Sequence, residues 1–278
     1  MQRKITDMTR TDPFALVLTF LGGLVLLFII APLLSMFFGT PLNDVFATAG
    51  EKEVLDSIWL TLVASFGGTL FFAFLVIPLA YILARKDFPG KRIVNGIIDI
   101  PIVIPHTAAG IAVLGFVSRD TAIGQVASSL GFEFVGHPTG IALAMAFVSV
   151  PFLINAARDG FSAVPVRLEQ AAYNLGANPF RVFFTISIPL AWRHILSGFI
   201  MMFARGLSEF GAVVIIAYHP ITAPVMIYER FTSFGLKYAK PVAVIFILVC
   251  LVFFLLLRML TRAKKETVVK NTSVKNIQ

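Results

Sequence analysis

A charged pair interrupts one of the most apolar runs of this chain, and it carries the residues best suited to chemistry. Between His194 and Ala217 the only Lys, Arg, Asp or Glu side chains are Arg205 and Glu209. A spacing of four places both on one face of a helix, where they can pair. Ser208 adds a hydroxyl, and Gly206 allows close approach of another backbone. The group therefore either fixes helix packing or forms a pathway or gate for an ion.

The pairing has a consequence for any ion that passes. A charge in the middle of a bilayer costs about 2.5–3.5 kcal/mol on insertion scales, so both side chains should face a protein interior or a cavity. An isolated Arg205 would attract a dianion strongly, whereas the carboxylate of Glu209 weakens that attraction. Weak binding is what a conduit requires, because a tight site would hold the ion.

A second polar interruption falls in the apolar run from residue 93 to residue 117. Its members are Asp99, Pro101, Pro105, His106 and Thr107. Proline lacks the backbone donor of a helix and frees the carbonyl four residues earlier. In a membrane such a break is tolerated where protein or water satisfies the backbone. Two interpretations stay open: a kinked packing helix, or a bend that lines a pathway with His106 and Thr107 as donors.

Other kinds of chemistry find no support in the residues. The four histidines are too far apart in sequence to form a local HxxxH or HxxH pair, and Cys250 is the only cysteine. We therefore expect no metal site, no disulfide and no enzyme active site. No GxxxxGK[ST] loop occurs, and the run from Pro89 to Arg92 lacks its leading glycine and trailing hydroxyl. Any ATP would have to be bound by a partner chain.

The composition indicates a membrane protein. Of 278 residues, 58% are hydrophobic and only 14% are charged, whereas about 25% are charged in an average soluble domain. A soluble fold could not cover so much apolar surface. The net charge of +8 does not indicate nucleic-acid binding, because the basic residues lie in short runs between apolar stretches. That spacing is what the positive-inside rule predicts for loops.

Six apolar stretches are long enough to cross a bilayer, which needs about 20 residues per helix. They are residues 14–38, 57–84, 93–117, 139–157, 194–217 and 241–257. The first could be a cleaved signal, but a signal has an apolar core of only about 7–15 residues. We therefore expect an uncleaved first helix. The predicted fold class is an all-α integral membrane protein with six transmembrane helices.

The charge distribution orients these spans. With six spans and both termini in the cytoplasm, the inner segments hold most of the 23 Lys and Arg residues, including the basic tail from Arg258. A seventh span within Phe210–Tyr228 would move that tail outside, against the positive-inside rule. We therefore expect Tyr218–Lys240 to be an outer loop that dips partly into the membrane. The tail is expected to anchor to anionic lipid headgroups.

The inner segment between the fourth and fifth spans, Arg158–Arg193, has the punctuation of two short helices. Pro165 suits the first turn of a helix, and Gly176 suits a left-handed C-terminal cap. Asn178 then offers a capping side chain directly before Pro179. The sequence predicts a helix–turn–helix on the inner membrane face. It serves either as a surface-lying connector or as a docking surface for a partner.

One run within this segment follows a fixed spacing. Its residues are Glu169, Gln170, Ala171, Ala172, Gly176, Ile186 and Pro189. The run resembles the EAA loop of ABC importer permeases, whose pattern is Glu-Ala-Ala, three residues, Gly, nine residues and Ile-x-Leu-Pro. Two positions depart from it: Gln170 takes the place of Glu, with Glu169 one residue earlier, and Ile188 replaces Leu. The resemblance implies that these residues couple the chain to an ATPase, through either Glu169 or Gln170.

Two further runs, from Asp99 to Gly110 and from Ala204 to Val213, resemble the molybdate/tungstate permease family. Sulfate permeases share much of the second run. The resemblance covers residues 54–260 and implies the transmembrane core of a type I ABC importer permease, with its coupling loop at 158–193. Residues 1–53 then form an N-terminal segment with the first transmembrane helix, and residues 261–278 a basic cytoplasmic tail.

What the resemblance implies is an ATP-driven importer of molybdate or tungstate in the cell membrane. The chain would form the translocation pathway as a homodimer in the lipid bilayer, by alternating access. Two ATP-binding cassette subunits would lie inside, and an extracytoplasmic oxyanion-binding protein outside. The chain itself would bind no cofactor, since ATP and Mg²⁺ belong to the ATPases, and no nucleic acid.

Two alternatives remain beside this function. One is a sulfate or thiosulfate permease of the same class, because tetrahedral dianions differ little in charge. The other is an autonomous secondary anion transporter, which inverted repeats would support. We see no such repeats, and the loop Arg158–Arg193 would then have no partner to serve.

Overall fold

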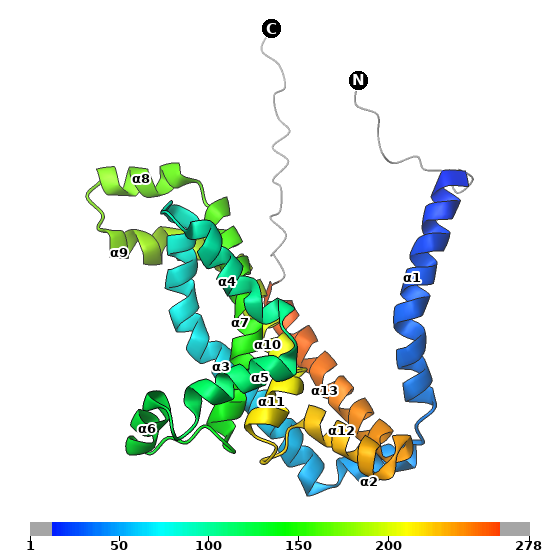
Figure 1. The fold of residues 1–278 in the computed structure, drawn as a ribbon. Helices are drawn as coiled ribbons and strands as arrows, with labels where there is room; N and C mark the ends of the chain where they lie inside the picture. The colour runs from blue at the N-terminus through cyan, green and yellow to red at the C-terminus, as the bar shows by residue number, and fades with distance from the viewer. Residues whose placement is uncertain (1–12, 262–278) are drawn as a thin grey trace. The chain divides into compact units, whose positions relative to one another are not determined.

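The computed structural model describes residues 13–261, and every regular element in that range is a helix (Figure 1). In chain order they are α1 (Pro13–Phe38), α2 (Leu42–Ala49), α3 (Lys52–Arg85), α4 (Lys91–Val103), α5 (His106–Val117), α6 (Ala122–Ser129), α7 (Pro138–Ala163), α8 (Val166–Asn174), α9 (Pro179–Val182), α10 (Ile188–Leu207), α11 (Gly211–Ile216), α12 (Ala223–Phe234) and α13 (Leu236–Thr261). One turn of π-helix, Phe183–Ser187, joins α9 to α10. The predicted all-α class is confirmed.

Five of these helices are long and apolar enough to cross a membrane, and α4 with α5 makes a sixth span. The two halves of that pair meet at an angle of 114°. Helix α12 has 12 residues, too few for a bilayer that needs about 20. The structure thus agrees with six spans and not with a seventh. The basic residues near the N-terminus and the basic tail from residue 262 lie outside the described residues, and the orientation of the spans stays a prediction.

The chain divides into two compact units. One combines the N-terminal part through Asp56 with Met226–Leu248, and the other combines Ser57–Val225 with the residues from Val249 onward. In the first unit, α1 buries none of its side chains. A helix that is apolar on every side and unburied suits a membrane span that faces lipid. Both polar clusters predicted from the sequence lie in the second unit.

Helix α7 is the centre of the second unit. It packs against α4, α5, α10 and α11 and shares two buried apolar clusters with α3 and α10. Glycines bring α7 and α10 into close contact: a Cβ atom at Gly198 would lie 2.7 Å from Ala156 Cβ, and one at Gly160 would lie 2.5 Å from His194 Cβ. Small residues at such crossings are the usual means by which membrane helices gain packing contact.

The fifth span lies closer to the N-terminus than predicted. We expected a helix over residues 194–217, but the continuous helical run is Pro179–Leu207, and α11 is a separate short helix. Pro189, in the first turn of α10, has no N–H to donate to the carbonyl of Thr185, which lies in the π-helical turn. The π-helical turn accommodates this mismatch, so the helix continues. The second of the two predicted short helices is therefore the first turn of the fifth span.

The break in the third span has one cause rather than three. We expected Asp99, Pro101 and Pro105 to interrupt it together, yet Asp99 and Pro101 lie inside α4. The chain turns at Ile104, whose ψ of 148° is extended, because a residue before proline is pushed out of the helical region. Pro105 then directly precedes α5. Asp99 instead accepts a hydrogen bond from Asn155 Nδ2 at 2.8 Å, which joins α4 to α7.

The glycine contact between α7 and α10 predicts the effect of a single methyl group. Gly198→Ala should lower the melting temperature of the purified protein, because overpacking of this kind costs about 1–3 kcal/mol. Gly67→Ala in α3 is the matched control, since nothing lies within 4 Å of a Cβ atom there. That control should leave the melting temperature unchanged or raise it slightly. Equal melting temperatures for the two variants would show that the crossing is looser than described.

Candidate functional site

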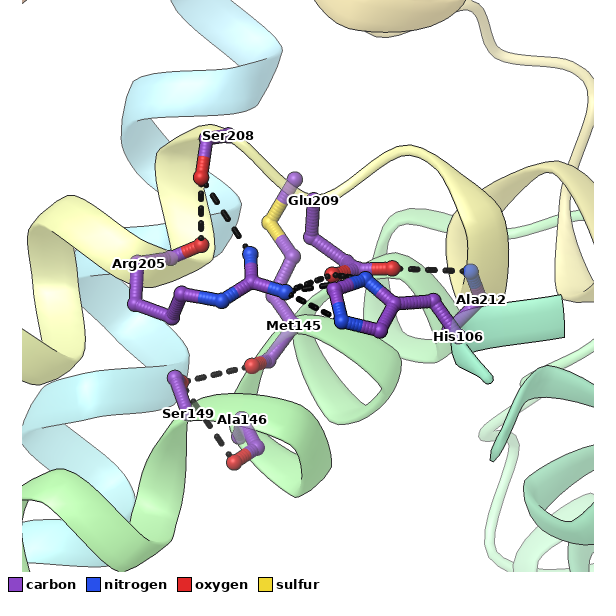
Figure 2. A network of polar contacts seen from close by, with 8 residues as sticks. All are labelled: His106, Met145, Ala146, Ser149, Arg205, Ser208, Glu209 and Ala212. Carbon is purple, nitrogen blue, oxygen red and sulfur yellow. Dashed lines mark hydrogen bonds and ion pairs between the residues drawn. The ribbon is translucent and has the colours of Figure 1, made fainter. Parts of the chain in front are cut away.

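Arg205 is the centre of a polar cluster that includes both interruptions found in the sequence (Figure 2). Its Nη2 donates to Glu209 Oε2 at 3.0 Å and lies 2.8 Å from His106 Nε2 and 2.9 Å from His106 Nδ1. Its Nη1 donates to Ser208 Oγ at 3.2 Å. His106 Nδ1 lies 2.9 Å from the same Glu209 oxygen. The structure thus brings together four of the seven residues predicted for the pathway.

Both ring nitrogens of His106 lie close to the ion pair. Nδ1 lies 2.9 Å from Glu209 Oε2 and 2.9 Å from Arg205 Nη2, and Nε2 lies 2.8 Å from the same Nη2. A guanidinium can only donate hydrogen bonds and an ionised carboxylate can only accept them, whereas a neutral imidazole has one nitrogen of each kind. His106 can therefore bridge the two charged side chains.

Glu209 is held by more than its arginine. The side chain is 0% exposed, and its Oε1 accepts from the backbone N–H of Ala212 at 2.9 Å. That N–H lies in the first turn of α11, where helical donors have no partner within the helix. The ion pair with Arg205 forms as predicted, but the expected geometry was wrong. Helix α10 ends at Leu207, so the two side chains meet across a helix break and not along one helix face.

Two glycines let α5 approach α11 and thereby place His106. A Cβ atom at Gly211 would lie 2.8 Å from His106 Cβ and 3.2 Å from the backbone nitrogen of Thr107. A Cβ atom at Gly110 would lie 2.8 Å from Ala212 Cα. Since backbone atoms cannot move aside as side-chain ends can, both positions require glycine. The break before α5 and the break before α11 therefore meet at the cluster.

The cluster is closed on one side and open on the other. Glu209 is fully buried, whereas the side chain of Arg205 is 22% exposed and that of His106 is 40% exposed. Ser208 and Thr107 are exposed as well. Pro105 lies next to His106, but Pro101 is buried inside α4 and is not part of the network in Figure 2. The open side offers guanidinium and hydroxyl donors, which are groups that bind oxyanions.

No metal site accompanies these groups. Among residues 13–261, no set of three or more His, Cys, Asp and Glu side chains is arranged to hold a metal ion. The chemistry available to the cluster is therefore hydrogen bonding and charge pairing.

A second buried ion pair joins Glu169 of α8 to Arg85 at the end of α3. Arg85 Nε donates to Glu169 Oε2 at 2.9 Å and Nη2 donates to Oε1 at 2.9 Å, so the guanidinium meets the carboxylate with two parallel bonds. Arg85 Nη2 also donates to the carbonyl of Val164 at 3.0 Å. Ser187 Oγ donates to Glu169 Oε1 at 2.7 Å. The side chains of Arg85 and Glu169 are only 11% and 5% exposed.

This pairing bears on the predicted contact with an ATPase. Both Glu169 and Gln170 were candidates, but Glu169 points inward and its carboxylate is occupied by Arg85 and Ser187. Gln170 is exposed, as are Ala171 and Leu175, whereas Ala172 is half-buried. The exposed residues of α8 thus include Gln170 and Ala171, with Arg167 before them and Asn174 after them. Neither Arg85 nor Ser187 was identified from the sequence, because Arg85 looks like any other basic residue at the inner end of a span.

The caps predicted around α8 are present. Gly176 follows the helix with a φ of 85°, the left-handed conformation that favours glycine. Asn178 Oδ1 accepts from the backbone N–H of Arg181 at 2.8 Å, directly before Pro179. Pro165 precedes α8 instead of beginning it. Ile186 lies in the π-helical turn, and Pro189 follows it in α10. The residues of the EAA-like run therefore lie on one bent connection between α7 and α10.

The chain matches the family described as binding-protein-dependent transport system inner membrane component over residues 76–266. It belongs to this family. It is a multi-pass membrane protein and a component of a transport system rather than a catalytic subunit. The family description itself names dependence on a binding protein. The matched residues include the polar cluster around Arg205 and the ion pair of Arg85 with Glu169.

Relatives that align with most of this chain are transport permeases. The chain is 40% identical to a molybdate/tungstate transport system permease protein WtpB of Methanocaldococcus jannaschii, over 91% of this chain and 99% of that protein. It is 41% identical to the protein of the same name from Pyrococcus abyssi, over 88% and 95%. A probable sulfate transport system permease protein of Chlorokybus atmophyticus is 32% identical, over 82% and 81%.

Solved structures show the same fold in ABC importers. A bacterial ABC transporter that imports the polysaccharide alginate has a chain with a TM-score of 0.70 at 18% identity, covering 91% of this permease and 96% of that chain. A chain of the MetNI methionine ABC transporter in an inward-facing conformation has a TM-score of 0.57 at 15% identity, covering 75% and 92%. The fold is therefore that of an importer permease, as predicted.

The different burial of Arg205 and Glu209 predicts an asymmetric response to mutation. Arg205→Gln leaves a fully buried carboxylate without its cation and should destabilise the permease by about 3–5 kcal/mol. Adding Glu209→Gln removes that charge and should restore most of the lost stability. Thermal unfolding of the detergent-purified protein measures both. If the double variant were no more stable than Arg205→Gln alone, the two charges would not be coupled.

Proposed function

We propose that this permease is the membrane subunit of an ATP-driven importer for molybdate or tungstate. The observation that carries the proposal is the 40% identity to a molybdate/tungstate permease over 91% of this chain and 99% of that relative. The relative named for sulfate transport is less similar, at 32% identity. Sulfate or thiosulfate is therefore the second candidate substrate, and it belongs to the same class of transporter.

The polar cluster around Arg205 is the proposed gate of the translocation pathway. A tetrahedral dianion needs hydrogen-bond donors and positive charge, and Arg205 with Ser208 supplies both on the exposed side of the cluster. Glu209 and His106 occupy the guanidinium in the structure described, so an anion would have to compete with them. Thr107 is exposed beside them. This competition would make the contact weak, as passage requires.

The cytoplasmic end is proposed to dock on the ATPases. Helix α8 presents Gln170 and Ala171, and Leu175 directly after the helix is 88% exposed. These side chains suit insertion into a groove of a partner. Ile186 lies in the π-helical turn and Pro189 in the first turn of α10. A displacement of the loop by the ATPase would therefore move the fifth span as well. ATP and Mg²⁺ would be bound by the ATPase subunits, and this chain would contribute no cofactor ligand.

The working unit is proposed to be a homodimer that alternates between outward- and inward-facing states. The cluster in each copy links two helix breaks, at α4–α5 and at α10–α11. Broken helices can change their angles at the break with little loss of packing, and they commonly line transport pathways. An oxyanion-binding protein outside the membrane would deliver the anion and contribute most of the selection among tetrahedral dianions.

Uptake by the reconstituted transporter tests the proposed function. Proteoliposomes that contain the permease with its ATPase subunits and binding protein should accumulate molybdate only with ATP. Vanadate should block the uptake. Tungstate should compete, whereas an excess of sulfate should not. Uptake of sulfate in preference to molybdate would make the chain a sulfate permease, and uptake without ATP would make it a secondary transporter.

The proposed gate is tested with the neutral double variant Arg205→Gln, Glu209→Gln. This variant leaves no buried charge without a partner, so the complex should assemble at the normal level. Molybdate uptake should fall about tenfold, which corresponds to the loss of about 1.4 kcal/mol from one charge-assisted contact. Gly115→Ala in α5 is the control, because a Cβ atom there meets nothing within 4 Å. Normal uptake by the double variant would remove the cluster from the pathway.

A further inference from the structure

We propose that Arg85 and Glu169 form an internal clasp through which the docking helix moves the spanning helices, so that Arg85 is a positioning residue for coupling. The inference rests on the proposed ATP-driven import. It assigns Glu169 a partner within the permease itself, whereas the resemblance to the EAA loop implies a contact with the ATPase through either Glu169 or Gln170.

Four structural elements meet at the clasp. Arg85 ends α3, the carbonyl of Val164 ends α7, and Glu169 lies in α8. Ser187 belongs to the π-helical turn that leads into α10. Arg85 donates to both Val164 and Glu169, and Ser187 donates to Glu169. One guanidinium and one carboxylate therefore connect the docking helix to the inner ends of three spans.

The contact between Arg85 and Glu169 has a fixed geometry. The guanidinium and carboxylate share two parallel hydrogen bonds, with Nε–Oε2 and Nη2–Oε1 both at 2.9 Å. This arrangement fixes direction as well as distance, unlike the point charge of a lysine. Arg85 Cζ also lies 6.0 Å from the centre of the Tyr81 ring. A contact of this kind transmits a displacement of α8 to α3 instead of absorbing it.

A buried apolar cluster adjoins the clasp at Val164, whose carbonyl accepts from Arg85. The cluster also includes Ala80 and Phe161, with Tyr81 and Phe183 packed against it. The rings of Tyr81, Phe161 and Phe183 lie 4.9–6.1 Å apart. The inner ends of α3 and α7 and the turn before α10 are thus packed together already. The ion pair of Arg85 with Glu169 adds α8 to this packed group.

Coupling, and not activity alone, is the quantity that tests the clasp. In proteoliposomes with the ATPases and binding protein, Arg85→Gln should lower the molybdate taken up per ATP hydrolysed. Glu169→Gln should do the same, and Arg85→Lys should rescue only part of the loss. Lys86→Gln is the control, because Lys86 is the exposed neighbour of Arg85 and makes no contact described for the clasp. A role in stability alone would reduce the amount of complex and leave the ratio of uptake to ATP unchanged.

The double variant distinguishes an internal partner from a partner on the ATPase. If each single substitution lowers the ratio about tenfold and the two residues serve one contact, the double variant should also lose about tenfold. Independent contacts would multiply to about a hundredfold loss. A multiplied loss, or a normal ratio in both single variants, would overturn the proposal.

A measurement on the permease without transport keeps this inference separate from the proposed function. Limited trypsin digestion should cut after the exposed Arg167 of α8 and the exposed Arg181 of α9 faster in Arg85→Gln than in Lys86→Gln. Equal cleavage rates in the two variants would show that Arg85 does not hold α8 in place and would overturn the proposal. If wild-type proteoliposomes take up no oxyanion with ATP, the proposed function fails, but the digestion result still reports on the clasp.

Discussion

An ionised carboxylate buried in an apolar bundle must be paired, and this requirement shapes the second unit of the molecule. Taking such a charge out of water costs several kcal/mol, and the cost is recovered only through a close cation and further hydrogen bonds. Glu209 and Glu169 are the two carboxylates concerned, and each has an arginine and at least one other donor. The positions of Arg205 and Arg85 follow from this need.

The same side chains also satisfy the backbone where helices end. A helix terminus leaves N–H or C=O groups without partners, and in an apolar setting they must find some. Glu209 accepts from the N–H of Ala212 at the start of α11, and Arg85 donates to the carbonyl of Val164 at the end of α7. Charge and helix breaks thus compensate each other. This explains why both ion pairs lie at interruptions and neither lies along a regular helix.

The two clusters differ in exposure, and this difference fits the separate roles proposed for them. The pair of Arg85 and Glu169 is nearly closed to solvent and is bonded twice in parallel, so it is suited to transmit force. The pair of Arg205 and Glu209 has an open side, where His106 and Ser208 share the guanidinium. A guanidinium that is shared among several partners and partly exposed can exchange one partner for an incoming anion at modest cost.

The sequence by itself determined the membrane setting, the six spans, the caps around Gly176 and Asn178, and the pairing of Arg205 with Glu209. These depend on composition, hydrophobic length and short-range spacing, which a chain carries locally. Tertiary structure decided the rest. The fifth span began at Pro179 and continued through a π-helical turn, and Pro105 alone bent the third. His106 reached Arg205 only because Gly110 and Gly211 let α5 approach α11. Glu169 turned inward to Arg85, 84 positions away in sequence, and no local pattern distinguishes that arginine from its neighbours.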